Sequence, residues 1–154
     1  MKYAHSIKLT VFSYENENIQ YILDAFLKFF PFDLQENKIE LKKTTAQGFN
    51  ESTITIFEAA LTKTNLINHF LEFILGSLGK KQKELILKQI ESRLDGHLDF
   101  FIRFDKDEWV NNKKLELTDA GKCFHLKISV AAFPRKREAG LKIMKELFEN
   151  KETK

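Results

Sequence analysis

The sequence predicts an α+β fold, a two-layer domain in which helices pack on one face of a mixed or antiparallel sheet. Several segments alternate between apolar and polar residues, which indicates strands with one face in water. Other segments repeat apolar residues at helical spacing. Two pairs of strands are joined by short links, which favours antiparallel or mixed pairing with helices on one side. We expect one domain over residues 1–154, with a charged, flexible tail from about residue 150.

The first half of the chain contains three expected strands and one helix. Alternation over 3–13 predicts the first strand. Apolar residues at helical spacing over 19–30 predict a helix, which Pro31 ends. Weak alternation over 38–45 predicts a second strand, and a threonine and isoleucine pattern over 52–62 predicts a third.

The middle of the chain is helical. Apolar periodicity predicts one helix over 64–78 and a more polar helix over 80–94. Gly79 separates the two helices, and Gly96 ends the second. Alternation over 97–104 then predicts a strand whose apolar side chains point inward.

A short helix and two strands follow. Asp105 with Glu108 three residues later predicts a capping box for a helix through Trp109. Residues 114–118 are expected to add a short strand, and 124–130 form the last long strand. The expected order is therefore β-α-β-β-α-α-β-β-β-α, where the last symbol is a C-terminal helix. The short helix through Trp109 is not counted in this order.

The C-terminal helix is expected to begin with a run of cations. Pro134 suits a first helical position, and Arg135, Lys136 and Arg137 follow it. Positive side chains are disfavoured at a helix N-terminus, whereas its free N–H groups attract anions. The run therefore suits a bound phosphate. A solvated charge run at a surface corner is the alternative interpretation.

With helices on one side, the outward strand residues form an open sheet face. By alternation this face includes Lys8, Thr10, Lys42, Thr53, Thr55, Arg103, His125, Lys127 and Ser129. Cations outnumber anions there, although Glu40 and Asp99 share the same parity. Such a face can be merely solvated, buried in a dimer, or used as a binding platform.

Composition limits the class of protein. The 25 cations against 22 anions leave a net charge of +3, which is too small to establish a polyanionic partner without local clustering. The fifteen phenylalanines are expected to fill the core. A single cysteine, Cys123, excludes an internal disulfide. Because no apolar run approaches the roughly 18 residues that span a bilayer, we expect a soluble, cytoplasmic protein without membrane contact.

Nothing in the sequence supports catalysis. No nucleophile has a recognisable neighbourhood, and no phosphate-cradling glycine loop is present. His69 and Glu72 have the spacing of helical metal ligands, but no third ligand lies near them in the sequence. We therefore expect no catalytic residue, no metal and no cofactor.

Three segments together carry a resemblance to a known family. They are Arg103-Phe104-Asp105-Lys106, then 124–130, then Phe133-Pro134-Arg135-Lys136-Arg137-Glu138-Ala139. Their order and spacing resemble the C-terminal signature of a small archaeal family described as predicted RNA-binding proteins or exosome-associated subunits. The likeness extends over about residues 5–148. It departs from the family pattern at 48–52, which lacks the family's second glycine and its Asn-Pro pair.

The resemblance implies a fold similar to that of the ribosomal protein that binds 5S rRNA. It also implies non-enzymatic binding of structured RNA, linked to ribosomal or exosomal RNA. The matching positions with suitable chemistry are Arg103, Lys106, Lys127, Arg135, Lys136 and Arg137. The alternative hypothesis is an assembly module, a homodimer or a subunit of an RNA-processing complex, that uses the open sheet face as its interface.

Overall fold

The computed structural model describes residues 1–48, 50 and 52–149, and it confirms the α+β class. The strands are β1 (Ala4–Tyr14), β2 (Lys42–Gln47), β3 (Thr53–Leu61), β4 (Asp99–Asp105) and β5 (Cys123–Val130). The helices are α1 (Ile19–Leu27), α2 (Thr64–Ser77), α3 (Lys80–Lys88), α4 (Ile90–Arg93), α5 (Lys106–Asn112) and α6 (Arg137–Glu149). The expected tail from about residue 150 lies outside the described residues.

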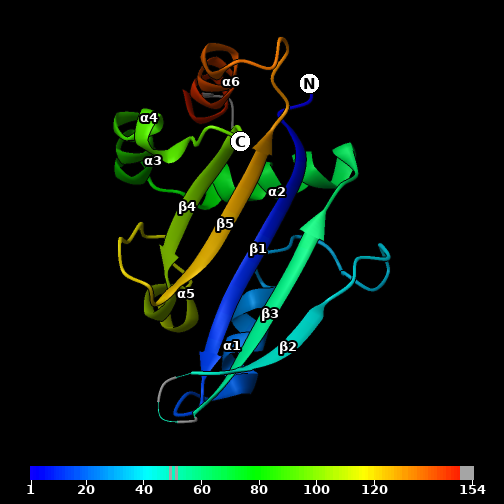
Figure 1. Cartoon of the computed structure of the whole chain (residues 1–154), viewed down its shortest axis with the longest axis vertical. Helices are drawn as coiled ribbons and strands as arrows, with labels where there is room; N and C mark the ends of the chain where they lie inside the picture. Colours follow the sequence, from blue (N-terminus) through cyan, green and yellow to red (C-terminus); the bar gives the residue numbers. More distant parts are fainter. Residues whose placement is uncertain (49, 51, 150–154) are drawn as a thin grey trace.

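The five strands form one antiparallel sheet in the order β2-β3-β1-β5-β4 (Figure 1). β1 lies at its centre and alternates between buried and more exposed residues, as β5 does. The helices lie behind the sheet and along its upper edge in Figure 1, so that its front face is uncovered. This front face is called the open face below. None of the helices in the described part of the chain is long and apolar enough to cross a membrane.

Phenylalanine rings fill the core between the sheet and the helices. Phe29, just after α1, is fully buried. Its ring centroid lies 4.4 Å from Trp109, 4.9 Å from Phe124 and 5.9 Å from Phe104. These rings join α1 and α5 to the inner face of β4 and β5, and they confirm that phenylalanine is used for packing there.

Several element boundaries differ from those predicted. α1 ends at Leu27 rather than at 30, and β2 starts at Lys42 rather than at 38. The backbone of Lys38 has a positive φ of 57°, which a β-strand does not allow. The helix predicted over 80–94 is divided at Gln89, whose backbone is not helical. The predicted strand over 114–118 is only an isolated bridge from Leu117 to Phe104.

The side chains of β3 point opposite to the prediction. Thr53 and Thr55 were expected on the open face, but both lie on the helix side, and Thr55 is buried. Three apolar residues further along the strand share their parity and enter the core: Phe57, Ala59 and Leu61. Because side chains alternate strictly along a strand, Ile54 and Ile56 turn to the open face.

The C-terminal helix begins three residues later than predicted. Its first backbone bond joins the Gly140 N–H to the Lys136 carbonyl at 3.1 Å, which places Lys136 just before the helix. The Phe133–Pro134 peptide bond is cis, and the Lys136 N–H donates to the Pro134 carbonyl at 2.7 Å. Pro134 therefore belongs to a turn and is not the first helical residue.

Candidate functional site

Strand register arranges the open face in rows that run across the sheet. One row, called the lysine row, contains Phe101 of β4, Lys127 of β5, Lys8 of β1 and Ala60 of β3. The next, called the histidine row, contains Arg103, His125, Thr10, Glu58 and, on β2, Lys42. Beyond it, Phe12, Ile56 and Thr44 form a third row, and Asp105 lies opposite Cys123 on the other two strands. Neighbours within a row lie close enough to interact directly.

Two lysines face each other in the lysine row. Lys8 and Lys127 are directly opposite residues of β1 and β5, and like charges in that arrangement are destabilising. Each has a carboxylate nearby, since the Lys8 Nζ lies 4.0 Å from Glu58 and the Lys127 Nζ lies 3.6 Å from Asp99. Both distances are longer than those of a strong charge-assisted hydrogen bond, so the two carboxylates compensate the lysines only in part.

His125 lies among cations and against an aromatic ring. Its ring centroid is 5.4 Å from that of Phe101, with 32° between the two planes. The pKa of His125 is lowered from its ordinary value, first by burial and then by nearby positive charges: those of Arg103, Lys8 and Lys127. The imidazole is therefore held in its neutral form by its surroundings.

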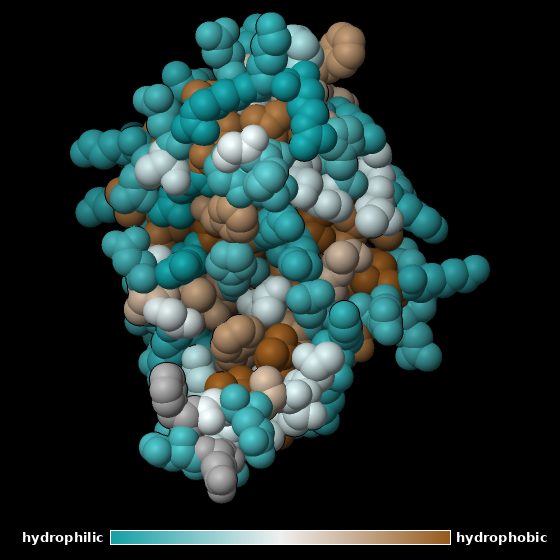
Figure 2. All heavy atoms as spheres, viewed as in Figure 1, coloured by the Kyte–Doolittle hydropathy of each residue, from teal (hydrophilic) through white to brown (hydrophobic). Residues whose placement is uncertain are grey.

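The open face is hollowed around these rows. A depression of about 570 Å³ is lined by Lys8, Arg103, Lys127, His125 and both outward aromatics of this region, Phe12 and Phe101. Glu58 is the carboxylate in its lining, against three cations. Figure 2 shows this face, where apolar side chains are exposed between hydrophilic ones near its centre. The depression thus combines positive charge with aromatic surface.

The run Arg135, Lys136 and Arg137, called the basic turn, lies beyond the end of β5 and leads into α6, whose first residue is Arg137. The Arg137 guanidinium donates to the backbone carbonyls of Glu91 and Leu94, the latter at 2.8 Å, and so ties α6 to the end of α4. The Arg135 guanidinium donates a long hydrogen bond of 3.4 Å to the carbonyl of His97, and the side chain of Lys136 is exposed.

An aromatic residue stands in front of the basic turn. The side chain of Phe133 is 96% exposed, which makes it the most exposed of the large apolar residues in the described part of the chain. A fully exposed phenylalanine beside three cations offers a flat apolar surface together with positive charge.

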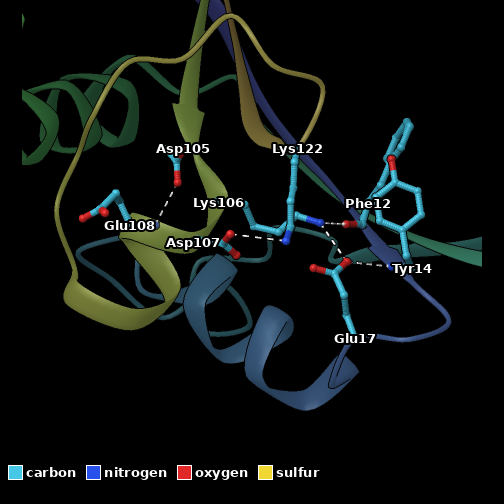
Figure 3. Close-up of polar contacts among 8 residues, drawn as sticks. All are labelled: Phe12, Tyr14, Glu17, Asp105, Lys106, Asp107, Glu108 and Lys122. Atoms are coloured by element: carbon cyan, nitrogen blue, oxygen red, sulfur yellow. Dashed lines mark hydrogen bonds and ion pairs between the residues drawn. The ribbon is translucent and has the colours of Figure 1, made fainter.

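Lys106 does not fit the expectation that it contacts RNA. Its side chain is 1% exposed, and its Nζ lies 2.9 Å from Glu17 Oε1 (Figure 3). The same ammonium donates to the Phe12 carbonyl and lies 4.9 Å from the centroid of the Tyr14 ring. The sequence suggested a cation misplaced at a helix start, but the end of β1 and the following turn neutralise it. We assign Lys106 a structural role.

The residues predicted from sequence fall into two groups. Arg103 and Lys127 lie on the open face, on neighbouring strands, and Arg103 donates to the Asp119 carbonyl at 3.3 Å. The basic turn lies at the end of β5. The prediction did not single out Phe101, although the parity of its inward neighbours Phe100 and Ile102 places an aromatic ring outward there.

The predicted local cap of α5 is present in part. The Asp105 side chain accepts a hydrogen bond from the Glu108 N–H at 2.9 Å, whereas the Asp105 N–H donates to the Glu116 carbonyl. His69 packs against the Phe32 ring at 5.6 Å between centroids. Within residues 1–48, 50 and 52–149, no group of three or more His, Cys, Asp or Glu residues is placed to hold a metal ion.

Comparisons with known proteins agree with this architecture. Residues 6–130 match the model of a family described as RNA binding. The chain is 27% identical over 149 residues to RNA-binding protein PAB1135 of Pyrococcus abyssi, covering 97% of this chain and 96% of that protein. A solved structure from Archaeoglobus fulgidus, protein AF2318 of the DUF54 family, is 26% identical with a TM-score of 0.82, covering 94% of this chain and 99% of that one. A DUF54 protein from Methanothermobacter thermautotrophicus shares the fold at 22% identity and a TM-score of 0.76, covering 95% of this chain and 98% of that one.

Proposed function

Because the chain belongs to the family described as RNA binding, we propose that it is a non-enzymatic protein that binds structured RNA through contacts to backbone phosphates. The name of its relative from Pyrococcus abyssi, an RNA-binding protein, supports the same function. Phosphate contacts position a protein on RNA without reading sequence, so recognition would be mainly of RNA shape.

One observation carries the proposal. Within residues 1–48, 50 and 52–149, no carboxylate oxygen lies within 4.0 Å of the side-chain nitrogens of Arg103 or of the basic turn. Arg103, Arg135 and Lys136 are all exposed. The chain thus presents cations that its own described anions do not neutralise, and the phosphates of RNA would supply the missing negative charge.

The proposed contacts divide between the two surfaces. On the open face, Arg103 and Lys127 would hold phosphates, with Lys8 beside them. At the end of β5, Arg135 and Lys136 would hold others. Arg137 would add its charge from a fixed position, because its guanidinium is already bound to backbone carbonyls of α4.

Binding of a structured RNA hairpin at several salt concentrations tests the proposal. The variant carries Arg103→Gln, Lys127→Gln and Lys136→Gln, and the control carries Lys28→Gln and Lys81→Gln, exposed cations at the end of α1 and on α3. Each lost phosphate contact should reduce the slope of log affinity against log salt by roughly 0.7 to 0.9. The proposal is wrong if the test variant keeps the affinity and slope of wild type, or if the control loses as much.

The identity of the RNA follows from the resemblance alone. We propose ribosomal or exosomal RNA as the target and the cytoplasm as the location, in keeping with the family likeness. Crosslinking in cell extract and sequencing of the attached RNA would check this. Recovery of unrelated RNA in proportion to its abundance would contradict it.

A second candidate function is assembly through the open face. It is favoured by the outward position of Ile56 and Phe12, which adds apolar surface to the depression. Light scattering of wild type and of a variant with Lys8→Glu and Lys127→Glu would test it. A dimer that dissociates on charge reversal, with RNA affinity unchanged, would favour assembly over RNA binding.

A further inference from the structure

We propose that the depression on the open face is a subsite for one unpaired nucleotide, whose base stacks on Phe101 and His125 while its phosphate bridges Lys8 and Lys127. This inference rests on the proposed RNA binding and specifies which part of the RNA this surface takes. It departs from binding by shape alone, because it requires a base that is free of its pairing partner.

The first support is the aromatic pair. Phe101 and His125 come from neighbouring strands and lie diagonally across the open face, with 5.4 Å between ring centroids. Both side chains are half-buried, so that each ring is fixed at its base and reachable from solvent. An exposed sheet that carries fixed aromatic rings suits stacking with unpaired bases, because every base has a flat π face.

The second support is the placement of charge around that pair. Phe101 lies opposite Lys127 in the lysine row, and His125 lies opposite Arg103 in the histidine row. Lys8 is opposite Lys127 and completes the group. A phosphate between the two lysines would relieve the repulsion that the strand register imposes on them.

The size and chemistry of the depression agree with this occupant. Its volume of about 570 Å³ lies within the range of small-molecule sites, roughly 300–1,000 Å³. Its lining has three cations against Glu58, together with aromatic and apolar surface from Phe12 and Ile56. A purely apolar partner would take the three cations out of water and add no anion to the two lysine–carboxylate pairs or to Arg103, which is costly, whereas a nucleotide offers both a flat apolar base and a phosphate.

The state of His125 supplies an independent readout. The charged and titratable groups that face it are Arg103 on β4, Lys8 on β1, Glu58 on β3, and Cys123 and Lys127 on its own strand. Burial, and then the positive neighbours, lower the pKa of His125 in the free protein. A bound phosphate would offset the positive neighbours, whereas a stacked base would bury the ring further. An oligomer that has phosphates but no bases should therefore raise this pKa and bind more tightly as pH falls.

The test compares RNA with a backbone that has no bases. The probes are an oligoadenylate and an abasic oligomer of equal length, and the variants are Phe101→Leu and His125→Gln. Tyr21→Leu is the control, since Tyr21 is an exposed aromatic residue on α1. Phe101→Leu should weaken oligoadenylate binding roughly tenfold, the order of one lost stacking contact, and leave abasic binding unchanged. Tyr21→Leu should change neither.

The outcomes separate this inference from the proposed function. Equal oligoadenylate affinity in wild type and Phe101→Leu, or an equal loss for both probes, overturns the stacking subsite while RNA binding stands. Absence of binding to either probe and to hairpin RNA at low salt overturns both. A nuclear magnetic resonance titration that shows a higher His125 pKa with the abasic oligomer bound supports the phosphate contact, and an unchanged pKa overturns it.

Discussion

Replacing Lys106 should lower the free energy of unfolding. It should not weaken the binding of RNA by the folded chain. Lys106→Met keeps most of the length of the side chain and removes its charge. The Nζ of Lys106 bonds to Glu17 at 2.9 Å and to the Phe12 carbonyl, and it lies over the Tyr14 ring. The substitution leaves a largely buried carboxylate and a backbone carbonyl without these partners (Figure 3).

The magnitude follows from what remains after the substitution. Removing one partner of a buried ion pair costs about 3–5 kcal/mol. The side chain of Glu17 is 15% exposed and still accepts the Tyr14 N–H at 2.9 Å, so water and one hydrogen bond compensate it in part. We therefore expect the lower end, about 3 kcal/mol, which corresponds to a fall of about 6–12 °C in the midpoint of thermal unfolding for a chain of this size.

Urea unfolding and thermal melting followed by circular dichroism measure this effect. The matched control is Lys122→Met, because the Lys122–Asp107 pair spans 3.3 Å between side chains that are 52% and 62% exposed. Such a pair contributes about 0–1 kcal/mol, so the control should be close to wild type. Adding Glu17→Gln to Lys106→Met should recover part of the loss, since no unpaired carboxylate then remains.

Two results would refute this account of Lys106. Stability equal to that of Lys122→Met would show that the buried pair contributes nothing. A Lys106→Met protein of wild-type stability with weakened RNA binding would return Lys106 to the RNA-binding surface.

Three further predictions follow from other contacts. Arg137→Ala should destabilise the fold by about 1–3 kcal/mol in urea unfolding, because two backbone carbonyls at the end of α4, one of them partly buried, lose a charged donor. Lys136→Ala should change stability by less than about 0.5 kcal/mol, and equal losses would contradict the assigned roles. Folding lowers the pKa of His125, so the unfolded chain binds a proton at this residue more readily than the folded chain does. The stability of the wild type should therefore fall as pH drops below about 6.5. In His125→Gln the free energy of unfolding should depend less steeply on pH between about 8 and about 5, and an unchanged slope would refute the shift. Burial raises the pKa of the Cys123 thiol, so its alkylation near pH 8 should be slower than that of a free cysteine. Because Cys123 lines the depression, bound RNA should slow the alkylation further. An unchanged rate would show that RNA binds away from the depression.

The buried face of a strand could be predicted where apolar residues occupy only one of its two sets of alternating positions. It could not be predicted for β3, where both sets contain apolar residues. In β5 the residues of one parity are all apolar and those of the other are Cys, His, Lys and Ser, so the buried face follows from alternation alone. In β3 both Ile54 and Phe57 are apolar although they have opposite parity. Only packing against the helices decides between them, and this is why Thr55 was assigned to the wrong face.

The same limit applies to the candidate site. Arg103 and Lys127 could be placed on the open face because their strands alternate cleanly. Lys106 could not be placed, because Glu17, which neutralises it, lies 89 positions earlier in the chain and meets it only through the fold. The start of α6 was predicted too early for a related reason: Pro134 suits both a turn and a first helical position, and the turn is what forms.

The net charge of +3 does not indicate where the cations lie in the folded protein, and Lys106 and the lysine row lie in different environments. Lys106 is charged inside the protein and satisfied there, so it adds no attraction for an anion. Lys8 and Lys127 are held opposite each other by the register of β1 and β5, and each has one carboxylate, at 4.0 and 3.6 Å, distances too long for a strong ion pair. Folding therefore gathers positive charge that is only partly compensated onto one face, and it buries the charge of Lys106 inside the protein. The repulsion between the two lysines destabilises the free protein. A phosphate bound between them would remove this repulsion and also attract both lysines, so the free energy of binding should be most favourable on this face.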